Sequence, residues 1–223
     1  MTRRTAALLV GSLLAGAALA ADPPPIPLSA ARAYTALGVK VEETEYRGRR
    51  ALRVVEPKIN EGGGIALANG VTFANGTIEV DVAGLPAAGA VEASRGFIGI
   101  AFRVQTDPQR YECLYLRPTN GRADDQLRRN HSTQYVSEPE FPWHRLRKEQ
   151  PGVYESYVDL EPGAWTRLRI VVDGTRARLY VHDAPQPALI VNDLKLGDTQ
   201  GGIALWIGQG TEAYFSSLTI TPR

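Results

Sequence analysis

Short runs in which hydrophobic and polar residues alternate make up most of the chain from residue 39 onward. Alternation with a period of two is typical of β-strands that are buried on one face. Thr77 to Val82 and Thr166 to Val172 are clear examples, and Asp173-Gly174 then predicts a tight hairpin leading into Arg176 to His182. The other predicted strands cover residues 39–46, 50–55, 97–104, 111–116, 153–160, 187–191, 202–207 and 213–220. Helical periodicity is almost absent, and we expect one short helix at 29–37.

About a dozen short strands separated by Gly, Pro, Asn and Asp turns predict an all-β domain. Long connections between strands favour Greek-key crossings, so we expect a two-sheet antiparallel jelly-roll sandwich over residues 29–223. In the strand Phe97 to Val104, Gly99, Ala101 and Arg103 alternate with large apolar residues. Small residues on one face of a strand leave room for something to lie over the sheet.

The longest interruption of this pattern is the loop at residues 117–147. A loop this long is normally functional or disordered, and its aromatic residues argue against disorder. Its polar side chains include both donors and acceptors, which suits a neutral or acidic sugar. The candidate substrate-binding residues are Arg117, Asn120, Asp124, Arg128, Arg129, Asn130, Gln134, Tyr135, Trp143 and Arg145 in the loop, with Arg103 and Tyr157 on predicted strands.

Phe97 to Val104, the long loop and the segment GGIALWIGQGTEAYFSSL resemble the concanavalin A-like lectin/glucanase superfamily. The closest likeness is to LamG-like domains and the 3-keto-disaccharide hydrolase domain of exported bacterial proteins. The resemblance implies a curved jelly roll whose concave sheet carries a saccharide, either for binding or for cleavage. The E-x-D-x-x-E strand of laminarinase-like glucanases is not found, because Glu79-Val80-Asp81 is not followed by a second glutamate.

Cleavage of a glycosidic bond needs two carboxyl groups roughly 5 to 10 Å apart. Asp125 and Glu155 are the leading acid/base candidates. A second form of cleavage is β-elimination, as in polysaccharide lyases, with Arg129 binding an acidic sugar, His131 as base and Tyr135 as acid. The alternative for all these charged residues is purely structural, in which arginines and carboxylates pair and hold the loop in shape.

The leading hypothesis is therefore an exported carbohydrate-binding domain, with a glycoside hydrolase or lyase as the alternative and a structural module of the cell envelope as a third reading. Trp143 lies in the loop and is the most credible platform for a sugar ring. Trp165 and Trp206 lie on predicted strands, and we expect both to pack in the core.

The first twenty residues predict an export signal. Arg3 and Arg4 precede an apolar run that ends in an Ala-x-Ala cleavage motif, and residues 21–28 form a proline-rich leader. Removing residues 1–20 changes the net charge from +1 to −1, which gives no case for nucleic acid or a membrane surface as partner. The run is too short and too rich in Ala and Gly for a membrane span.

Cysteine and metal-ligand patterns narrow the chemistry further. Cys113 is the single cysteine and cannot form an internal disulfide; in a periplasmic or secreted protein, stability would then come from the core. We expect no cofactor and no metal site. Calcium at Asp124-Asp125 with Asn120 is chemically feasible, but no spaced ligand pattern supports it.

Overall fold

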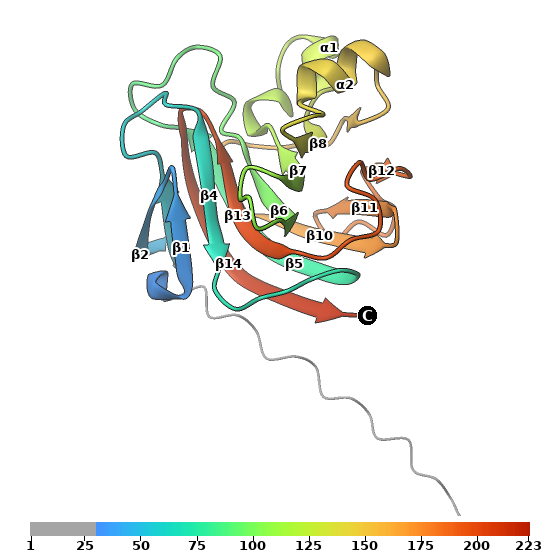
Figure 1. Ribbon diagram of the computed structural model, residues 1–223. Helices are drawn as coiled ribbons and strands as arrows, with labels where there is room; N and C mark the ends of the chain where they lie inside the picture. Colours follow the sequence, from blue (N-terminus) through green and yellow to red (C-terminus); the bar gives the residue numbers. More distant parts are fainter. Residues whose placement is uncertain (1–29) are drawn as a thin grey trace, which may run out of the picture.

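The computed structural model describes residues 30–223, which form two seven-stranded antiparallel sheets packed face to face (Figure 1). The predicted signal and leader, residues 1–28, lie outside the described residues. Sheet A contains, in spatial order, β1 (Tyr34–Leu37), β4 (Gly63–Ala68), β13 (Gly202–Gly208), β6 (Ile98–Val104), β7 (Tyr111–Leu116), β8 (Thr133–Glu138) and β9 (Glu155–Ser156). Sheet B contains β12 (Leu189–Val191), β11 (Arg176–Val181), β10 (Thr166–Asp173), β5 (Gly76–Pro86), β14 (Thr211–Pro222), β3 (Arg49–Val55) and β2 (Lys40–Tyr46).

The core lies between the two sheets, where the alternation in the sequence places it. Ile78, Val80 and Val82 of β5 are buried against Ile98 and Ile100 of β6, while the polar residues between them point outward. Each such side chain contributes about 1.5 to 3 kcal/mol of hydrophobic stabilisation relative to an exposed one. The antiparallel sandwich with its jelly-roll architecture confirms the predicted fold class.

Three local predictions were wrong. The segment at 29–37, for which we expected a helix, forms only the short 3-10 helix η1 (Ala31–Ala33), followed by β1, which pairs with β4. The predicted strand at 153–160 is reduced to the two residues of β9. No strand was predicted from the sequence at the position of β4. Edge strands such as β1 and β9 depend on pairing with a neighbour, which local periodicity does not reveal.

The segment at 117–147, predicted as an irregular loop, contains regular structure. It holds η2 (Pro118–Asn120), α1 (Gln126–Arg129), β8 and α2 (Trp143–Glu149). Figure 1 shows both α-helices gathered at one end of the sandwich, beyond β7 and β8. Among residues 30–223, no helix is long and apolar enough to cross a membrane.

Candidate functional site

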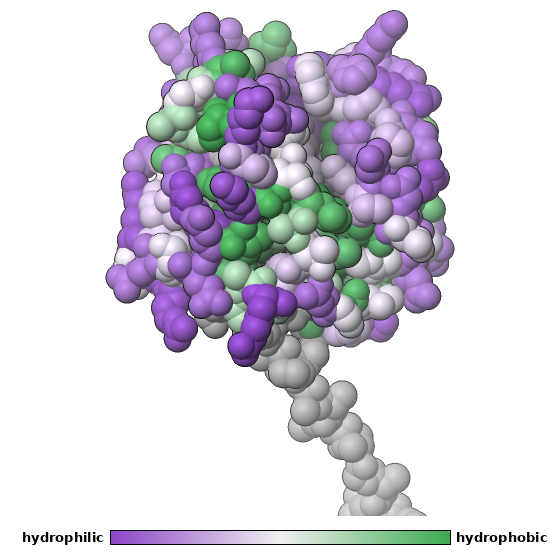
Figure 2. Space-filling model, turned by 60° about the vertical axis from the view of Figure 1, so that its left-hand side comes forward, coloured by the Kyte–Doolittle hydropathy of each residue, from purple (hydrophilic) through white to green (hydrophobic). Residues whose placement is uncertain are grey.

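A cleft of about 680 Å³ opens on the outer face of sheet A, the face turned away from the core. Residues of β7, β8 and β13 form its floor, and the segments 91–97 and 117–131 with helix α2 form its walls. The floor is mostly apolar apart from Glu138, with Tyr115, Val136 and Trp206 on it, and the walls carry charge. Figure 2 shows a face of the molecule on which hydrophobic residues gather in a central band with hydrophilic residues around it.

Two aromatic rings from different strands meet at the centre of the floor. Tyr115 of β7 and Trp206 of β13 stack with ring centroids 4.6 Å apart and planes inclined by 30°. Both residues pair with Gly99, which lies on β6 between them and has no side chain to keep the rings apart. The indole Nε1 of Trp206 donates to the hydroxyl of Tyr111 at 3.1 Å, which fixes the ring plane.

Trp206 corrects the expectation that both strand tryptophans pack in the core. Ile203, Leu205 and Ile207 face the core, so the alternation of β13 turns Trp206 to the cleft. Trp165 is also half-buried on an outer face, that of sheet B, where its indole donates to the carbonyl of Tyr46 at 3.3 Å.

Glu155 lies beneath the cleft wall and is bound by three basic side chains. It is only 6% exposed. Arg117 Nη1 donates to its Oε1 at 3.2 Å, and Arg147 Nε donates to its Oε2 at 2.9 Å. Nδ1 of His131 lies 2.9 Å from Oε2. Burial acts to raise the pKa of Glu155, but the arginines and His131 outweigh it and the pKa lies below its ordinary value.

The chemistry available to this cluster is electrostatic. A carboxylate with a lowered pKa and occupied oxygens is a poor proton donor, which does not suit Glu155 to general acid catalysis. The pKa of His131 is lowered, first by burial and then by Arg147 and Arg117, while Glu155 opposes the shift. The imidazole that lines the cleft is therefore neutral near pH 7.

Asn120, Asp125 and Arg128 are further predicted site residues that line the cleft. Asp125 is the N-cap of α1, and its Oδ1 accepts from the backbone amide of Arg128 at 2.7 Å. Arg128 donates from Nε to Asn120 Oδ1 at 3.0 Å and from Nη2 to Thr119 Oγ1 at 3.3 Å. The described residues hold no group of three or more His, Cys, Asp and Glu side chains placed to bind a metal ion.

Several predicted binding residues at the surface lie outside the cleft. Arg129 turns away from Arg128 and stacks over Tyr157, whose hydroxyl accepts from its Nη2 at 2.8 Å. Arg145 donates from Nε to Glu149 at 2.8 Å. Asp124 and Asn130 are exposed, and neither they nor Arg129, Arg145 and Tyr157 contribute to the cleft lining.

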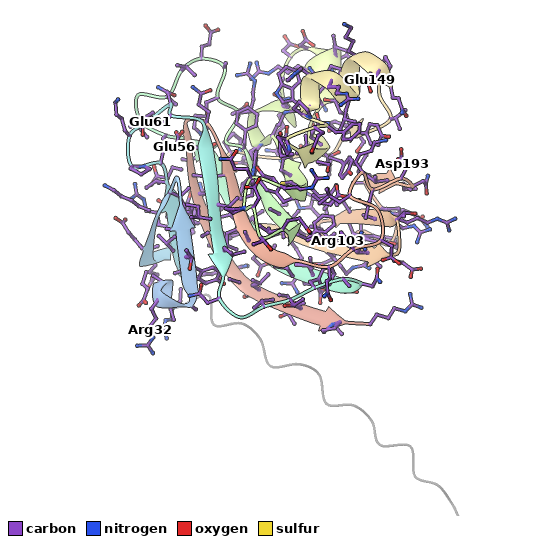
Figure 3. All side chains as sticks on the ribbon, viewed as in Figure 1. Arg32, Glu56, Glu61, Arg103, Glu149 and Asp193 are labelled. Atoms are coloured by element: carbon purple, nitrogen blue, oxygen red, sulfur yellow. The ribbon has the colours of Figure 1, made fainter. Side chains whose placement is uncertain are left out.

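Three other predicted binding residues are fully buried, which corrects their expected contact with a ligand. Gln134 accepts from Arg117 Nη2 at 2.9 Å and supports the cleft from below. Tyr135 faces the core, where its hydroxyl donates to Glu112. Arg103 donates to the carbonyl oxygens of Ala74 at 2.9 Å and of two glycines, at the end of β6 opposite the one near α1 and α2 (Figure 3).

Trp143 lies at the start of α2, is 44% exposed and lines the cleft. The guanidinium of Arg147 stacks over its ring at 4.7 Å, which holds the indole at the cleft wall. Arg147, like Trp206 and Tyr115, was not among the predicted site residues. Its position on the same helix as Trp143, four residues later, is the local signal that points to it.

Glu138 is a further carboxylate of the cleft, and it was not among the site residues predicted from the sequence. It is half-buried at the end of β8, where it pairs with Tyr111 in the sheet, and its carboxylate has no hydrogen-bond or ion-pair partner among residues 30–223. Burial raises its pKa, and the nearby charge of His144 opposes that shift. The cleft therefore carries two carboxylates, Asp125 at the N-terminus of α1 and Glu138 at the end of β8.

No protein-family model matches the sequence, and no curated protein matches it. Among solved structures, the carbohydrate binding module CBM66 from Bacillus subtilis aligns with a TM-score of 0.59 and 14% identity, covering 85% of this chain and 95% of the module. A Bacillus subtilis protein of unknown function with a galectin-like fold aligns with a TM-score of 0.58 and 11% identity over 88% of this chain and 95% of its own. The cellulose induced protein Cip1 aligns at 0.52 and 11% identity over 87% and 93%. These similarities show that the chain shares its jelly-roll fold with these structures.

Proposed function

We propose that this protein binds a saccharide in the cleft of sheet A, with Trp206 as the platform for one sugar ring and the buried ring of Tyr115 stacked against the indole to hold it in place. The stacked pair on the cleft floor is the observation that carries this proposal. The C–H faces of a pyranose ring pack on aromatic planes, and a site for such a ring needs an apolar body with a few placed polar groups. Trp143 supplies a second aromatic surface at the wall.

The structural neighbours support the same proposal, since one of them is itself a carbohydrate binding module. Saccharide binding also agrees with the expected export of the chain to the periplasm or the medium, where such ligands occur. The likeness of the sequence to LamG-like and 3-keto-disaccharide hydrolase domains favours the same class of ligand.

The environments of Asp125 and Glu155 favour binding of a saccharide without cleavage. Retaining or inverting hydrolysis needs one carboxyl group that donates a proton and a second that acts as nucleophile or base. Glu155 is held ionised by its basic partners, and the Oδ1 of Asp125 caps a helix. The predicted acid/base pair of Asp125 and Glu155 therefore lacks a proton donor.

One observation favours a hydrolase as the second candidate. Glu138 lines the cleft with a raised pKa and without a bound partner, as a general acid would. If the protein cleaves its ligand, we expect Glu138→Gln to abolish turnover while leaving binding within about threefold.

Calorimetric titration with a panel of oligosaccharides tests the proposed function. We expect Trp206→Ala to weaken binding of the best ligand by about tenfold or more, because the stacking surface is lost. Trp165→Ala, on the outer face of sheet B, is the matched control and should bind like the wild type. Mass spectrometry of the same mixtures separates a binding protein from an enzyme. Binding that survives Trp206→Ala unchanged, or no binding to any saccharide, would refute the proposal.

A further inference from the structure

Two arginines of the cleft have no acidic partner. Arg95 and Arg128 both line it, and neither guanidinium forms an ion pair within 4.0 Å of a carboxylate among residues 30–223. The other two arginines of the cleft, Arg117 and Arg147, both bind Glu155. The guanidinium charges of Arg95 and Arg128 are therefore not neutralised by an ion pair, and Asp125, the carboxylate of the same wall, accepts from the backbone amide of Arg128 instead.

Both unpaired guanidinium groups are fixed in place. Arg128 is held by the two side-chain hydrogen bonds described above, and Arg95 Nη1 donates to the carbonyl oxygens of Glu92 at 2.5 Å and Ser94 at 2.9 Å. The backbone amide of Thr119, whose hydroxyl accepts from Arg128, donates to the carbonyl of Arg95 at 3.2 Å. This bond joins the two segments. The Nε and Nη2 of Arg95 and the Nη1 of Arg128 have no partner among the described residues and remain available as donors.

The two charges also affect one another. Burial lowers the pKa of Arg95, the nearby charges of Arg128 and Arg117 lower it further, and the charge of Glu92 opposes the shift. Holding two like charges in a partly buried wall costs free energy, which an anion bound between them would recover. Planar guanidinium groups bind carboxylate and sulfate groups with two parallel hydrogen bonds, so the arrangement is chemically matched to such an anion.

The charged residues of the cleft lie at different distances along its floor. Glu138 is the last residue of β8. Ser132, which comes just before the strand and six residues before Glu138, marks the end near the arginines, because its carbonyl accepts from the backbone amide of Arg117. At the rise of a strand, six residues span roughly 20 Å. An acidic group of a ligand is therefore attracted to the end of the cleft that holds Arg95 and Arg128, whose guanidinium groups have no ion-pair partner there.

Resting on the saccharide binding proposed above, we propose that the ligand is an anionic saccharide, whose carboxylate or sulfate group is bound by Arg95 and Arg128 while its ring lies on Trp206. The chemical class is thus an oligosaccharide with uronic acid or sulfated residues. The apolar floor of the cleft contacts the sugar ring, and the arginines of the wall bind its acidic substituent.

The test is a pair of titrations with each acidic oligosaccharide and its matched neutral form, in which the carboxylate is reduced to the alcohol or the sulfate is removed. We expect the acidic form of one pair to bind about 10- to 100-fold more tightly, which is what a hydrogen-bonded ionic contact contributes. Arg95→Gln and Arg128→Gln should each reduce this preference about tenfold or more. The preference should also fall as salt is added.

Arg178→Gln is the control, because Arg178 is exposed on β11 of the other sheet and the substitution changes the net charge equally. It should leave the preference unchanged. Equal affinity for acidic and neutral forms, or an equal effect of Arg178→Gln, would overturn the inference while leaving the proposed function in place. Binding of none of the saccharides would overturn both. Because Arg128 also holds a loop, Arg95→Gln is the decisive variant if Arg128→Gln does not fold.

Discussion

Tyr115 and Trp206 stack on one another although their strands are not neighbours in sheet A. Strand β6 runs between β7 and β13, and the residue of β6 that pairs with both aromatic residues is Gly99. Adjacent strands are about 4.8 Å apart, so the two rings reach across the width of one strand. The missing side chain of Gly99 is what allows the platform to form.

A Gly99→Ala substitution should therefore disrupt the platform. A Cβ atom at this position would lie 2.3 Å from the carbonyl oxygen of Leu114 and 2.5 Å from the Cβ of Tyr115, so backbone and ring must shift. We expect a loss of about 1 to 3 kcal/mol in the free energy of unfolding, measured by urea denaturation, and loss of saccharide binding by calorimetry.

Ala101→Gly is the control for that experiment. Ala101 lies on the same face of β6 as Gly99. The substitution lowers the free energy of unfolding by about 1 kcal/mol without crowding the two rings. Binding should persist in Ala101→Gly. If Gly99→Ala bound a saccharide as well as Ala101→Gly does, the stacked pair would not be the binding platform.

The sequence predicted the parts of this molecule that depend on local pattern. The β10–β11 hairpin follows from alternating residues on each side of Asp173-Gly174. Small residues on β6 indicated that something lies over the sheet, and the structure shows that Tyr115 and Trp206 lie over Gly99. Which outer face of the sandwich carries the cleft depends on the long connections, and local alternation does not contain that information.

Strand β8 shows why the site itself was harder to predict. Thr133, Gln134 and Ser137 are polar but fully buried, so their pattern resembles a loop. Two of them are satisfied by partners from elsewhere in the chain: Ser156 contacts the hydroxyl of Thr133, and Arg117 donates to Gln134. The partners of Glu155 likewise lie 8 to 38 residues away in the sequence, which only the folded chain brings together.

Glu155→Gln should destabilise the protein in a pH-dependent manner. The substitution leaves Arg117 and Arg147 without their counter-ion, and breaking such a buried pair costs about 3 kcal/mol. The folded-state pKa of Glu155 lies below the ordinary 4.5, so its ionised form stabilises the fold above that pH. This contribution is lost as the pH falls through the folded-state pKa.

Urea denaturation of wild type and variant at a series of pH values measures this contribution. The difference in unfolding free energy should be largest near neutral pH and shrink below about pH 4.5. Asp159→Asn, which removes an exposed partner of Arg122, should cost less than about 1 kcal/mol. A difference between wild type and Glu155→Gln that stays constant with pH would contradict the ionic role of Glu155.

Tyr135→Phe should affect stability and leave function intact. The hydroxyl donates to Glu112 and accepts from the backbone amide of Lys195 at 2.8 Å, both inside the core. Burial raises the pKa of Glu112 and the bond from Tyr135 opposes that rise, so the variant leaves a buried carboxyl group short of a donor. We expect a loss of about 1 to 3 kcal/mol in unfolding free energy.

Saccharide binding, and any turnover, should be unchanged in Tyr135→Phe. Tyr157→Phe is the matched control, since it removes a surface hydroxyl and should cost less than about 0.5 kcal/mol. Loss of turnover in Tyr135→Phe with a fully folded protein would instead restore the elimination mechanism in which Tyr135 is the acid.

Glu56 fixes one edge of the cleft, and its loss should loosen that edge. The carboxylate is 3% exposed and accepts from four backbone amides, those of Asn60, Gly62, Gly63 and Gly210. Glu61 lies in the same loop, but it is exposed and only pairs with Lys58 (Figure 3). Because Gly62 lines the cleft, Glu56 positions part of the wall without contacting the ligand itself.

We expect Glu56→Ala to lower the free energy of unfolding by about 2 to 3 kcal/mol, since several buried amides lose their acceptor. Hydrogen exchange at Gly62, Gly63 and Gly210 should accelerate selectively, and saccharide affinity should fall as the wall becomes mobile. Glu61→Ala should show none of these changes. Unaltered exchange at these glycines in Glu56→Ala would mean that the loop keeps its conformation through its own backbone, and the positive φ angles of Asn60, Gly62 and Gly63 would then be its main determinant.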